Sequence, residues 1–306
     1  MARILTVGIA TLDIINAVDG FPPEDAEVRA TAQEMRRGGN ASNTAVVLSQ
    51  LGHECAFAGS LADDASSEVI RAELKAYRID MGAVATVAGG RVPVSYVTLN
   101  QQNGSRTIVH YRELPEYRFA DFARIDLHNF DWLHFEGRNV PETRVMLDHA
   151  RQQRPTLPIS VEFEKPRPEI ESLCAGADLL LYSRGYVQKS RVQQGRTQQG
   201  AEALTDPVAF LREQHRRWPG SEHTCTWGAD GAWGIDRHGG ITHSPAPQLS
   251  SVVDTLGAGD TFNAGMIHGR LSGGGLSQAL AEACQLAAEK CARQGLHGLR
   301  LGGSSQ

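Results

Sequence analysis

The sequence contains few cysteines, and no two of them form a close pair. Five occur in 306 residues, an odd number without a C-x-x-C spacing: Cys55, Cys174, Cys225, Cys284 and Cys291. A disulfide framework needs paired cysteines and a cysteine-based zinc site needs clustered ones, so both classes are excluded. We therefore expect reduced thiols, as is typical of a cytoplasmic protein.

The sequence also has no excess of positive charge and no long apolar run. Thirty Lys and Arg against thirty-five Asp and Glu give a formal net charge of -5, so the basic surface of a nucleic-acid binder is missing. The apolar start of the chain, residues 4–18, is interrupted by Asp13 and Asn16, has no basic cluster and begins like a strand, so we expect a strand there and not a signal peptide. No stretch approaches the roughly 20 apolar residues of a membrane helix, so we expect neither nucleic acid nor membrane as a partner.

The apolar residues that are present follow two alternating patterns. Short β-branched or apolar runs predict core strands at residues 4–9, 55–60, 132–135, 159–163, 179–182 and 224–227. Apolar residues at helical spacing predict helices at 42–51, which Gly52 would end, and at 66–78. This alternation is typical of an α/β fold with a mostly parallel central sheet flanked by helices.

Two segments break the alternation. Residues 13–35 have no helical period, and residues 91–112 predict two strands around the hairpin signal Asn103-Gly104. If both segments meet in space, they form a small sheet that could act as a lid; otherwise they are two unrelated surface hairpins. A further polar segment, residues 188–199, predicts an exposed loop.

The most informative segment, residues 252–265, joins an apolar strand end to a glycine turn that opens a helix. Backbone N–H groups and the positive end of the helix dipole meet there and predict an anion site. Gly257 and Gly259 would let the backbone approach a phosphate closely. Asp260 follows directly and is either a helix N-cap or a general base that removes a proton from a substrate hydroxyl during phosphoryl transfer.

A second glycine pair, Gly38-Gly39, leads into a helix that begins near Ala41. Asn40 and Asn43 are three residues apart, so their amides can project the same way and bind adjacent hydroxyls of a polyol. Capping of the helix by Asn40 is the structural alternative. The sequence has no Walker A motif, no H-E-x-x-H and no G-x-S-x-G, which excludes P-loop, metalloprotease and serine hydrolase classes.

Both glycine segments resemble signature motifs of the ribokinase family of carbohydrate kinases. Residues 254–260 match its D-T-x-G-A-G-D pattern, and residues 38–45 match its G-G-x-x-x-N-x-A pattern. The stretches that resemble the ketohexokinase group within this family are 37–43, 106–109, 134–139, 161–167 and 284–287. The resemblance implies one kinase domain over 1–306, with a ribokinase-like three-layer α/β fold and a small β-sheet lid formed by about 13–37 and 91–113.

The resemblance also implies roles for individual residues. Asp260 would be the catalytic base, and the amides of Gly257, Ala258 and Gly259 would form the anion hole. The residues implied to contact the sugar are Asp13, Asp25, Gly39, Asn40, Asn43 and Asp260. Of these, Asp25 would reach the sugar from the lid of a partner subunit, so a homodimer joined through the lid is implied.

A further set of residues is implied to bind the nucleotide: Arg106, Gly231, Gly257, Gly259 and Cys284. Arg106 would reach the triphosphate from the lid. Gly231 would line the nucleotide, or mark an ordinary turn between strands, and Cys284 would lie beside the adenine, or be a buried core thiol. Arg138 and Lys165 follow strand ends, where sites of α/β proteins gather, or are solvated charges.

As a whole, the sequence predicts an ATP-dependent kinase of a ketohexose that converts D-fructose to fructose 1-phosphate. Another small sugar, a sugar acid or a nucleoside stays open as acceptor, because fold and phosphate site do not fix it. A catalytically silent sugar- or nucleotide-binding regulator is the alternative of another class. The Mg2+ ligands stay unknown: residues 183–186 lack the N-x-x-E motif of much of the family, so ATP phosphates and water would hold the ion.

Overall fold

An eight-stranded sheet forms the centre of the computed structural model, which describes residues 1–193 and 206–301. Its order is β14-β13-β12-β11-β10-β9-β1-β4; neighbours from β12 to β4 pair in parallel, whereas β13 and β14 are antiparallel. The bounds are β1 Arg3–Val7, β4 Glu54–Ala58, β9 Trp132–Glu136, β10 Ile159–Phe163, β11 Leu179–Tyr182, β12 Glu222–Thr226, β13 Ala232–Ile235 and β14 Ile241–Ser244. The predicted, mostly parallel central sheet is confirmed.

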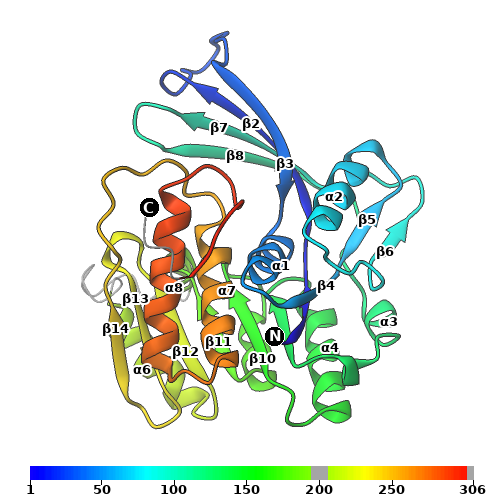
Figure 1. Cartoon of the computed structure of the whole chain (residues 1–306), viewed down its shortest axis with the longest axis vertical. Coiled ribbons are helices and arrows are strands. Elements are labelled where there is room, and N and C mark those ends of the chain that lie inside the picture. Colours follow the sequence, from blue (N-terminus) through cyan, green and yellow to red (C-terminus); the bar gives the residue numbers. More distant parts are fainter. Residues whose placement is uncertain (194–205, 302–306) are drawn as a thin grey trace.

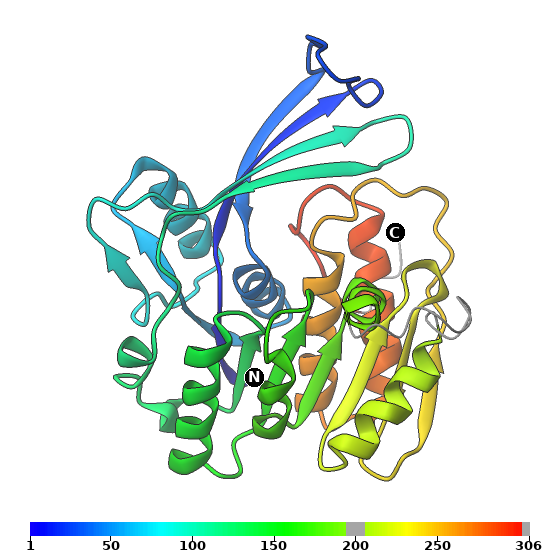
Figure 2. The same cartoon turned by 180° about the vertical axis from the view of Figure 1, so that it is seen from behind.

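Helices cover both faces of this sheet (Figures 1 and 2). One face is covered by α1 (Asn40–Gln50), α7 (Ala258–Leu271) and α8 (Leu276–Cys291), the other by α4 (Val140–Gln153), α5 (Arg184–Gln193) and α6 (Pro207–Arg217). The alternation of side chains along a strand explains the two cores. On β11, Leu179 and Leu181 join the core under α7 and α8, whereas Leu180 and Tyr182 join the core under α4 and α6. This three-layer arrangement confirms the predicted α/β class.

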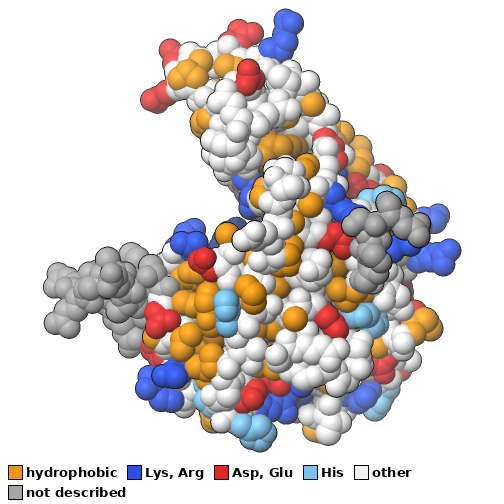
Figure 3. Space-filling view, turned by 60° about the vertical axis from the view of Figure 1, so that its left-hand side comes forward, with side chains coloured by type: hydrophobic (Ala, Val, Ile, Leu, Met, Phe, Trp, Pro, Cys, Tyr) orange, Lys and Arg blue, Asp and Glu red, His pale blue; other side chains and the backbone are white. Residues whose placement is uncertain are grey.

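A four-stranded sheet, called the small sheet below, stands away from the body (Figures 1 and 3). Its strands in order are β3 (Ala32–Gly38), β2 (Thr11–Val18), β7 (Val94–Asn100) and β8 (Arg106–Tyr111). β2 and β7 pair in parallel, and the two outer pairs are antiparallel. The two segments that break the sequence pattern therefore meet in one sheet, and the alternative of two unrelated hairpins is wrong.

The remaining elements are shorter. They are the pair β5 (Ser60–Ala62) and β6 (Ala85–Val87), the helices α2 (Ala65–Ala76) and α3 (Phe119–Phe122), and the 3-10 turns η1 (Leu127–Asn129), η2 (Ile170–Gly176) and η5 (Gly228–Asp230). Helix α2 contacts both β2 and β3, so it supports the base of the small sheet. Its N-cap is Asp64, whose side chain accepts the Ser67 N–H at 2.9 Å.

Most predicted elements agree closely with the observed ones. The strands at 159–163 and 179–182 coincide with β10 and β11, and the other predicted strands and helices end within two residues of observed bounds. The exposed loop at 188–199 is wrong in its first part, because α5 continues to Gln193. Tyr186 and Val187 anchor that helix on the core, and Gln, Lys and Arg are good helix formers. The rest of the segment lies outside the described residues.

Two further expectations concern the membrane and the thiols. In the parts of the chain that the structure describes, each helix is too short or too polar to cross a membrane. All five cysteines are free thiols, and four of them are buried. These unpaired thiols agree with the prediction, made from the odd number of cysteines, that the fold is not built on disulfides.

Candidate active site

The two glycine-rich segments come together where α1 and α7 begin. Asn43, in the first turn of α1, donates its side-chain N–H to Asp260 Oδ2 of α7 at 2.6 Å. Asn43 is 7% exposed and Asp260 is 6% exposed, so the contact is shielded from bulk water. The structure thus brings together two residues that lie far apart along the chain and that two separate sequence motifs identify as candidate site residues.

Asp260 is not the cap of α7. The N-cap is Gly257, with a φ of 85°, and no side-chain cap hydrogen bond is present among the described residues. Asp260 is the third helical residue, and its carboxylate turns to Asn43 instead of the backbone. Burial raises the pKa of Asp260 to about 7, although the hydrogen bond from Asn43 opposes the rise. The capping interpretation is therefore wrong for Asp260, and a carboxyl group that exchanges a proton near neutral pH fits general base chemistry.

Three glutamates that the sequence interpretation did not select surround this carboxylate. Glu136 ends β9, Glu162 lies in β10 and Glu164 follows β10, so all three lie at the carboxyl ends of parallel strands. Burial, followed by the charges of Asp260, Glu136 and Glu164, raises the pKa of Glu162 well above its ordinary value. The strand ends were the available signal, since sites of open α/β sheets gather there.

Asn40 contacts these glutamates. Its side-chain N–H group lies 3.1 Å from Glu162 Oε2 and 3.4 Å from Glu164 Oε2. The N-cap of α1 is Gly39, and in the part of the chain that the structure describes no side chain makes a cap hydrogen bond there. The capping alternative for Asn40 is therefore wrong, and the amide faces the acidic cluster at the start of α1.

The glycines before α1 make room for Asp13 of β2. A Cβ on Gly38 would lie 2.1 Å from Asp13 Oδ2, and a Cβ on Gly39, whose φ is +97°, would lie 2.4 Å from the Ile9 carbonyl oxygen. Thr11 donates its hydroxyl to Asp13 Oδ1 at 2.9 Å, which fixes the buried carboxylate. Asp13 thus lies beside the start of α1.

The first turn of α7 offers donors to an anion. Within the described chain, the N–H groups of Gly259 and Asp260 have no backbone acceptor, as expected of a first helical turn. The Ala258 N–H points to Thr255 O at 3.3 Å. Arg106 reaches across from the small sheet and donates to the Thr255 hydroxyl. A guanidinium group and free N–H groups at one helix start fit a phosphate.

Gly231 and Cys284 both lie next to the backbone oxygen of Ser244. A Cβ on Gly231, whose φ is +88°, would lie 2.1 Å from Ser244 O. The Cys284 thiol donates to the same oxygen at 3.6 Å. The antiparallel turn between β12 and β13 requires this glycine, so the ordinary-turn interpretation accounts for Gly231 by itself, and Cys284 is a buried thiol.

Asp25 does not join the site of its own chain. It lies in the exposed loop between β2 and β3, at the end of the small sheet farthest from the body (Figure 1). Arg138 pairs with Glu136 at 2.8 Å and Glu116 at 2.9 Å, and Lys165 pairs with Glu164 at 3.3 Å. Arg138 is thus a structural partner of the acidic cluster, whereas Lys165 is more than half exposed.

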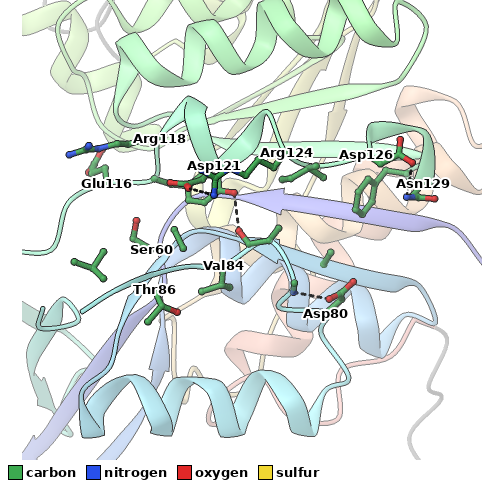
Figure 4. Close-up of a pocket in the computed structure, with 18 of the residues that line it drawn as sticks. Ser60, Asp80, Val84, Thr86, Glu116, Arg118, Asp121, Arg124, Asp126 and Asn129 are labelled. Carbon is green, nitrogen blue, oxygen red and sulfur yellow. Dashed lines mark hydrogen bonds and ion pairs between the residues drawn. The ribbon is translucent and has the colours of Figure 1, made fainter. Parts of the chain in front are cut away.

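A cavity of about 730 Å³ lies elsewhere, between β6 and α3, and Figure 4 shows its lining. No residue predicted for the site lines it. Its charges are mixed and partly paired, for example Arg124 with Asp121 at 3.7 Å. A second cavity, of about 270 Å³, is lined by Asp13, Arg37 and Asn43 and so borders the candidate site.

The described residues contain no group of three or more His, Cys, Asp and Glu side chains that could hold a metal ion. Ser183, at the end of β11, donates its hydroxyl to the Glu164 backbone oxygen, and α5 follows directly. The position of the missing N-x-x-E motif thus supplies no carboxylate. This donor set does not fit a protein-built metal cage.

Comparisons with known proteins agree with this geometry. The sequence pattern of the pfkB family carbohydrate kinases matches residues 1–299. The chain is 38% identical over 304 residues to ketohexokinase of Mus musculus, with 97% of this chain and 98% of that protein covered. It is 25% identical to an ATP-dependent ribose-1-phosphate kinase of Halopiger xanaduensis, with 96% and 94% covered.

A solved structure confirms the fold. Ribokinase of Cryptococcus neoformans, crystallised in complex with ADP, matches with a TM-score of 0.77 at 19% identity, with 98% of both chains covered. The predicted ribokinase-like fold is thus confirmed, as is the resemblance on which it was based. The chain belongs to the PfkB family of carbohydrate kinases, phosphotransferases that act on an alcohol group.

Proposed function

We propose that this kinase transfers the γ-phosphoryl group of ATP to the 1-hydroxyl of a ketohexose, with D-fructose as acceptor and fructose 1-phosphate as product. The observation that carries the proposal is the buried Asp260 carboxylate in the first turn of α7, next to free N–H groups. A base and an anion site lie within one helical turn, as phosphoryl transfer to a hydroxyl requires. The 38% identity to murine ketohexokinase supports the choice of acceptor.

Asp260 removes the proton from the acceptor hydroxyl in this proposal. Burial raises its pKa toward neutrality, which makes the carboxylate a stronger base than an exposed aspartate. Asp13, Asn40 and Asn43, which lie around the start of α1, orient the sugar. The Gly39 backbone lies next to these side chains, and any side chain at residue 39 would collide with Ile9 O. Orientation of the hydroxyl toward Asp260 lowers the entropic barrier to reaction.

The phosphate side of the site is the start of α7. In this proposal the N–H groups of Gly257, Ala258 and Gly259 form the anion hole for the transferred group. The free Gly259 N–H supports this role, whereas the Ala258 N–H would have to leave Thr255 O. Arg106 would contact the phosphate chain from the small sheet. Its contact with Thr255 supports this role, because it holds the guanidinium over the loop before α7. A Mg2+ ion bound through ATP phosphates and water would offset phosphate charge.

We further propose that Gly231 and Cys284 line the nucleotide. The Cys284 thiol bonds to Ser244 O, and a Cβ on Gly231 would collide with the same oxygen, so both residues lie next to Ser244, which supports this placement. The solved ribokinase that carries ADP has the same fold, which supports nucleotide binding in general terms. We also propose a cytoplasmic location, which the five free thiols support.

The small sheet would act as a lid and as a dimer interface. The strand register puts Asp13, Ser95 and His110 in one row on one face, and Met35, Ile14, Tyr96 and Val109 in one row on the opposite face. The face with Asp13 closes over the sugar. Met35, Tyr96 and Val109 are 54%, 50% and 65% exposed, an apolar row that one chain leaves uncovered.

A second copy of the chain is the occupant that we propose for this apolar row. The loop between β2 and β3, which carries Asp25, supports this choice, because it lies at the end of the small sheet away from the body (Figure 1), where Asp25 would meet the sugar of the partner. Two lids packed together bring each Asp25 loop toward the other body. The dimer would then be required for a complete sugar site.

ATP consumption in a coupled assay tests the proposed function. The purified protein is offered ketoses, pentoses, sugar acids and nucleosides, and phosphorus NMR locates the new phosphate ester. We expect fructose to have the highest kcat/KM, with the phosphate on carbon 1. A higher kcat/KM with another acceptor would contradict the choice of sugar and leave the kinase mechanism standing. Sugar binding without ATP consumption would contradict catalysis altogether and favour the silent regulator.

The Asp260→Asn variant tests the base. Asparagine keeps the shape but cannot take the proton, so kcat should fall by about 10² to 10⁴ while ATP and sugar still bind. Asp236→Asn is a matched control, because Asp236 lies in an exposed surface turn between β13 and β14 and should keep wild-type kcat. Near-parental turnover of Asp260→Asn would remove Asp260 from the mechanism.

A further inference from the structure

A buried arginine lies directly behind the contact between Asn43 and Asp260. Arg37, near the end of β3, is 4% exposed. Its Nη1 donates to Asn43 Oδ1 at 2.7 Å and to the Ser42 hydroxyl at 2.8 Å. Asn43 Nδ2 in turn donates to Asp260 Oδ2 at 2.6 Å. The three side chains form a continuous hydrogen-bonded chain from the small sheet to the proposed base.

The chemistry of arginine fixes the direction of this chain. A guanidinium group has donors and no acceptor, so the atom of Asn43 that faces Arg37 must be the oxygen. The Asn43 NH2 group must therefore face Asp260. In the flipped amide, the Asn43 oxygen would face the Asp260 carboxylate, and two acceptors would meet in a buried space.

The burial of the Arg37 charge should lower the stability of the fold, so packing alone does not explain its position. Burial lowers the pKa of Arg37, and the charges of Glu73, Tyr77, Asp260 and Asp13 oppose that fall. Glu73 of α2 accepts the Arg37 backbone N–H at 2.9 Å, but its carboxylate lies 3.8 Å from Nε, which has no hydrogen-bond partner among the described residues. A buried cation with an incompletely matched partner indicates a role beyond packing.

We propose that Arg37 is a positioning residue for phosphoryl transfer: it locks the Asn43 amide with its NH2 group toward Asp260 and so maintains the free carboxylate that accepts the substrate proton. This inference rests on the proposed role of Asp260 and adds the residue that controls it. Arg37 touches no reacting atom in this scheme and acts only through Asn43 and through its charge.

The charges around Asp260 explain why such control is needed. Glu136 from β9 and Glu164 after β10 raise the pKa of Asp260, and the buried Glu162 is coupled to it as a further acidic neighbour. Asn43 and the positive charge of Arg37 act in the opposite direction. Loss of Arg37 removes its charge and frees the Asn43 amide to flip, so Asp260 would hold its proton to higher pH.

The test is the pH profile of kcat/KM for Arg37→Met, Arg37→Gln and Arg37→Lys. The acid limb reports the base of the free enzyme. In Arg37→Met we expect this limb to move up by about one pH unit or more, which lowers kcat/KM at pH 6.5 by about tenfold. Lysine keeps a charge and donates only, so Arg37→Lys should restore most of the wild-type profile. Gln lacks the charge, so its limb should lie between the other two.

Arg36→Met is the matched control. Arg36 is the neighbouring arginine on β3, and it pairs with Asp254 at 3.1 Å and with Glu34 at 3.6 Å, not with Asn43. Its removal also takes one cation from the base of the small sheet, yet the acid limb should stay at the wild-type pH. If the acid limb of kcat/KM moved by the same amount in Arg36→Met and Arg37→Met, the shift would come from the loss of any nearby positive charge. That result would overturn the proposal.

Other outcomes are equally decisive. An acid limb that stays in place in Arg37→Met, with only a lower melting temperature, would show a structural role and overturn the proposal. If Arg37→Met does not fold, Arg37→Gln decides, because a wild-type limb without the charge contradicts the proposal. Failure of the proposed function is distinguishable: Asp260→Asn would then keep its turnover, whatever the Arg37 variants do.

Discussion

The ammonium group of Lys290 lies 2.8 Å from the carboxylate of Asp254, and both side chains are shielded from solvent. Lys290 Nζ also donates to the Asp254 backbone oxygen at 2.7 Å. The Asp254 carboxylate accepts the Leu256 N–H as well, at 2.8 Å. One lysine of α8 therefore holds both ends of the residue that opens the loop before α7, and it sets the position of the anion-binding turn.

Replacement of this lysine should cost stability. Lys290→Met leaves the Asp254 carboxylate buried with Arg36 as its remaining cation, so the free energy of unfolding should fall by about 3 kcal/mol. Urea denaturation measures the change. Lys290→Met combined with Asp254→Asn removes both charges and should recover part of the loss. A loss below about 0.5 kcal/mol in the single variant, the range of ordinary surface substitutions, would contradict the importance of the pair.

A methyl group at Gly38 should damage the sugar site. Its Cβ would overlap Asp13 Oδ2 at 2.1 Å, so the Asp13 carboxylate must move away from the start of α1. We expect Gly38→Ala to lower kcat/KM for the sugar at least tenfold, while KM for ATP changes little. Gly220→Ala is the control, because a Cβ there meets no atom within 4 Å. Equal kinetics of the two variants would be inconsistent with a role for Asp13 in sugar binding.

Subunit mixing should show whether Asp25 acts across the dimer. Asp25→Asn and Asp260→Asn subunits each form defective homodimers, but a mixed dimer contains one site with both native aspartates. Random mixing should therefore restore about one quarter of the wild-type sites. Steady-state assays after denaturation and refolding together measure the recovery. No recovery above the sum of the two parents would argue against a shared site, as would light scattering that gives the 33.1 kDa monomer mass.

Stability should fall as the pH drops below about 6.5. Burial lowers the pKa of His134 to about 3 and the pKa of His223 to about 4, from an ordinary value of 6.5. Both rings stay neutral in the folded protein, whereas the unfolded chain takes up protons below pH 6.5, so acid favours unfolding. At pH 5.5 each ring should cost about 1.4 kcal/mol relative to neutral pH.

Urea denaturation at pH 7.5 and pH 5.5 checks this dependence. His134→Gln should reduce the loss between the two pH values by about 1.4 kcal/mol, because glutamine does not titrate, and should leave the contribution of His223. His238→Gln should keep the wild-type loss, since His238 is exposed to solvent. A loss of equal size in the wild type and in His134→Gln would exclude His134 as a source of acid sensitivity.

The sequence predicts those elements well that have one apolar helix face or one short apolar run. β10 and β11 are short apolar runs that are buried on both sides, so pattern and structure coincide. The polar end of α5 has no apolar stripe, and its helical state depends on the packing of Tyr186 and Val187 next to it. Local pattern reading cannot detect that support.

The site residues also fall into two groups, those that a local motif identifies and those that depend on the packing of distant segments. Asp260 and Asn43 lie in the first turns of helices that follow glycine-rich segments, a local pattern, and the sequence identifies both. Glu162 and Arg37 become notable only through burial, because each is an ordinary charged residue in a strand until other elements close over it. The capping alternative for Asp260 also needed coordinates, since Gly257 takes the cap position.

The parallel pairing of β2 with β7 has a consequence for how the chain folds. No hairpin connects these two central strands, and α1, β4 and α2 lie between them in the sequence. The small sheet must therefore wait for the body to bring residues 12 and 94 together, which makes it a late step of folding. In the interval, β2 and β7 expose unpaired edges, and crowded refolding at high protein concentration should trap chains by pairing between them.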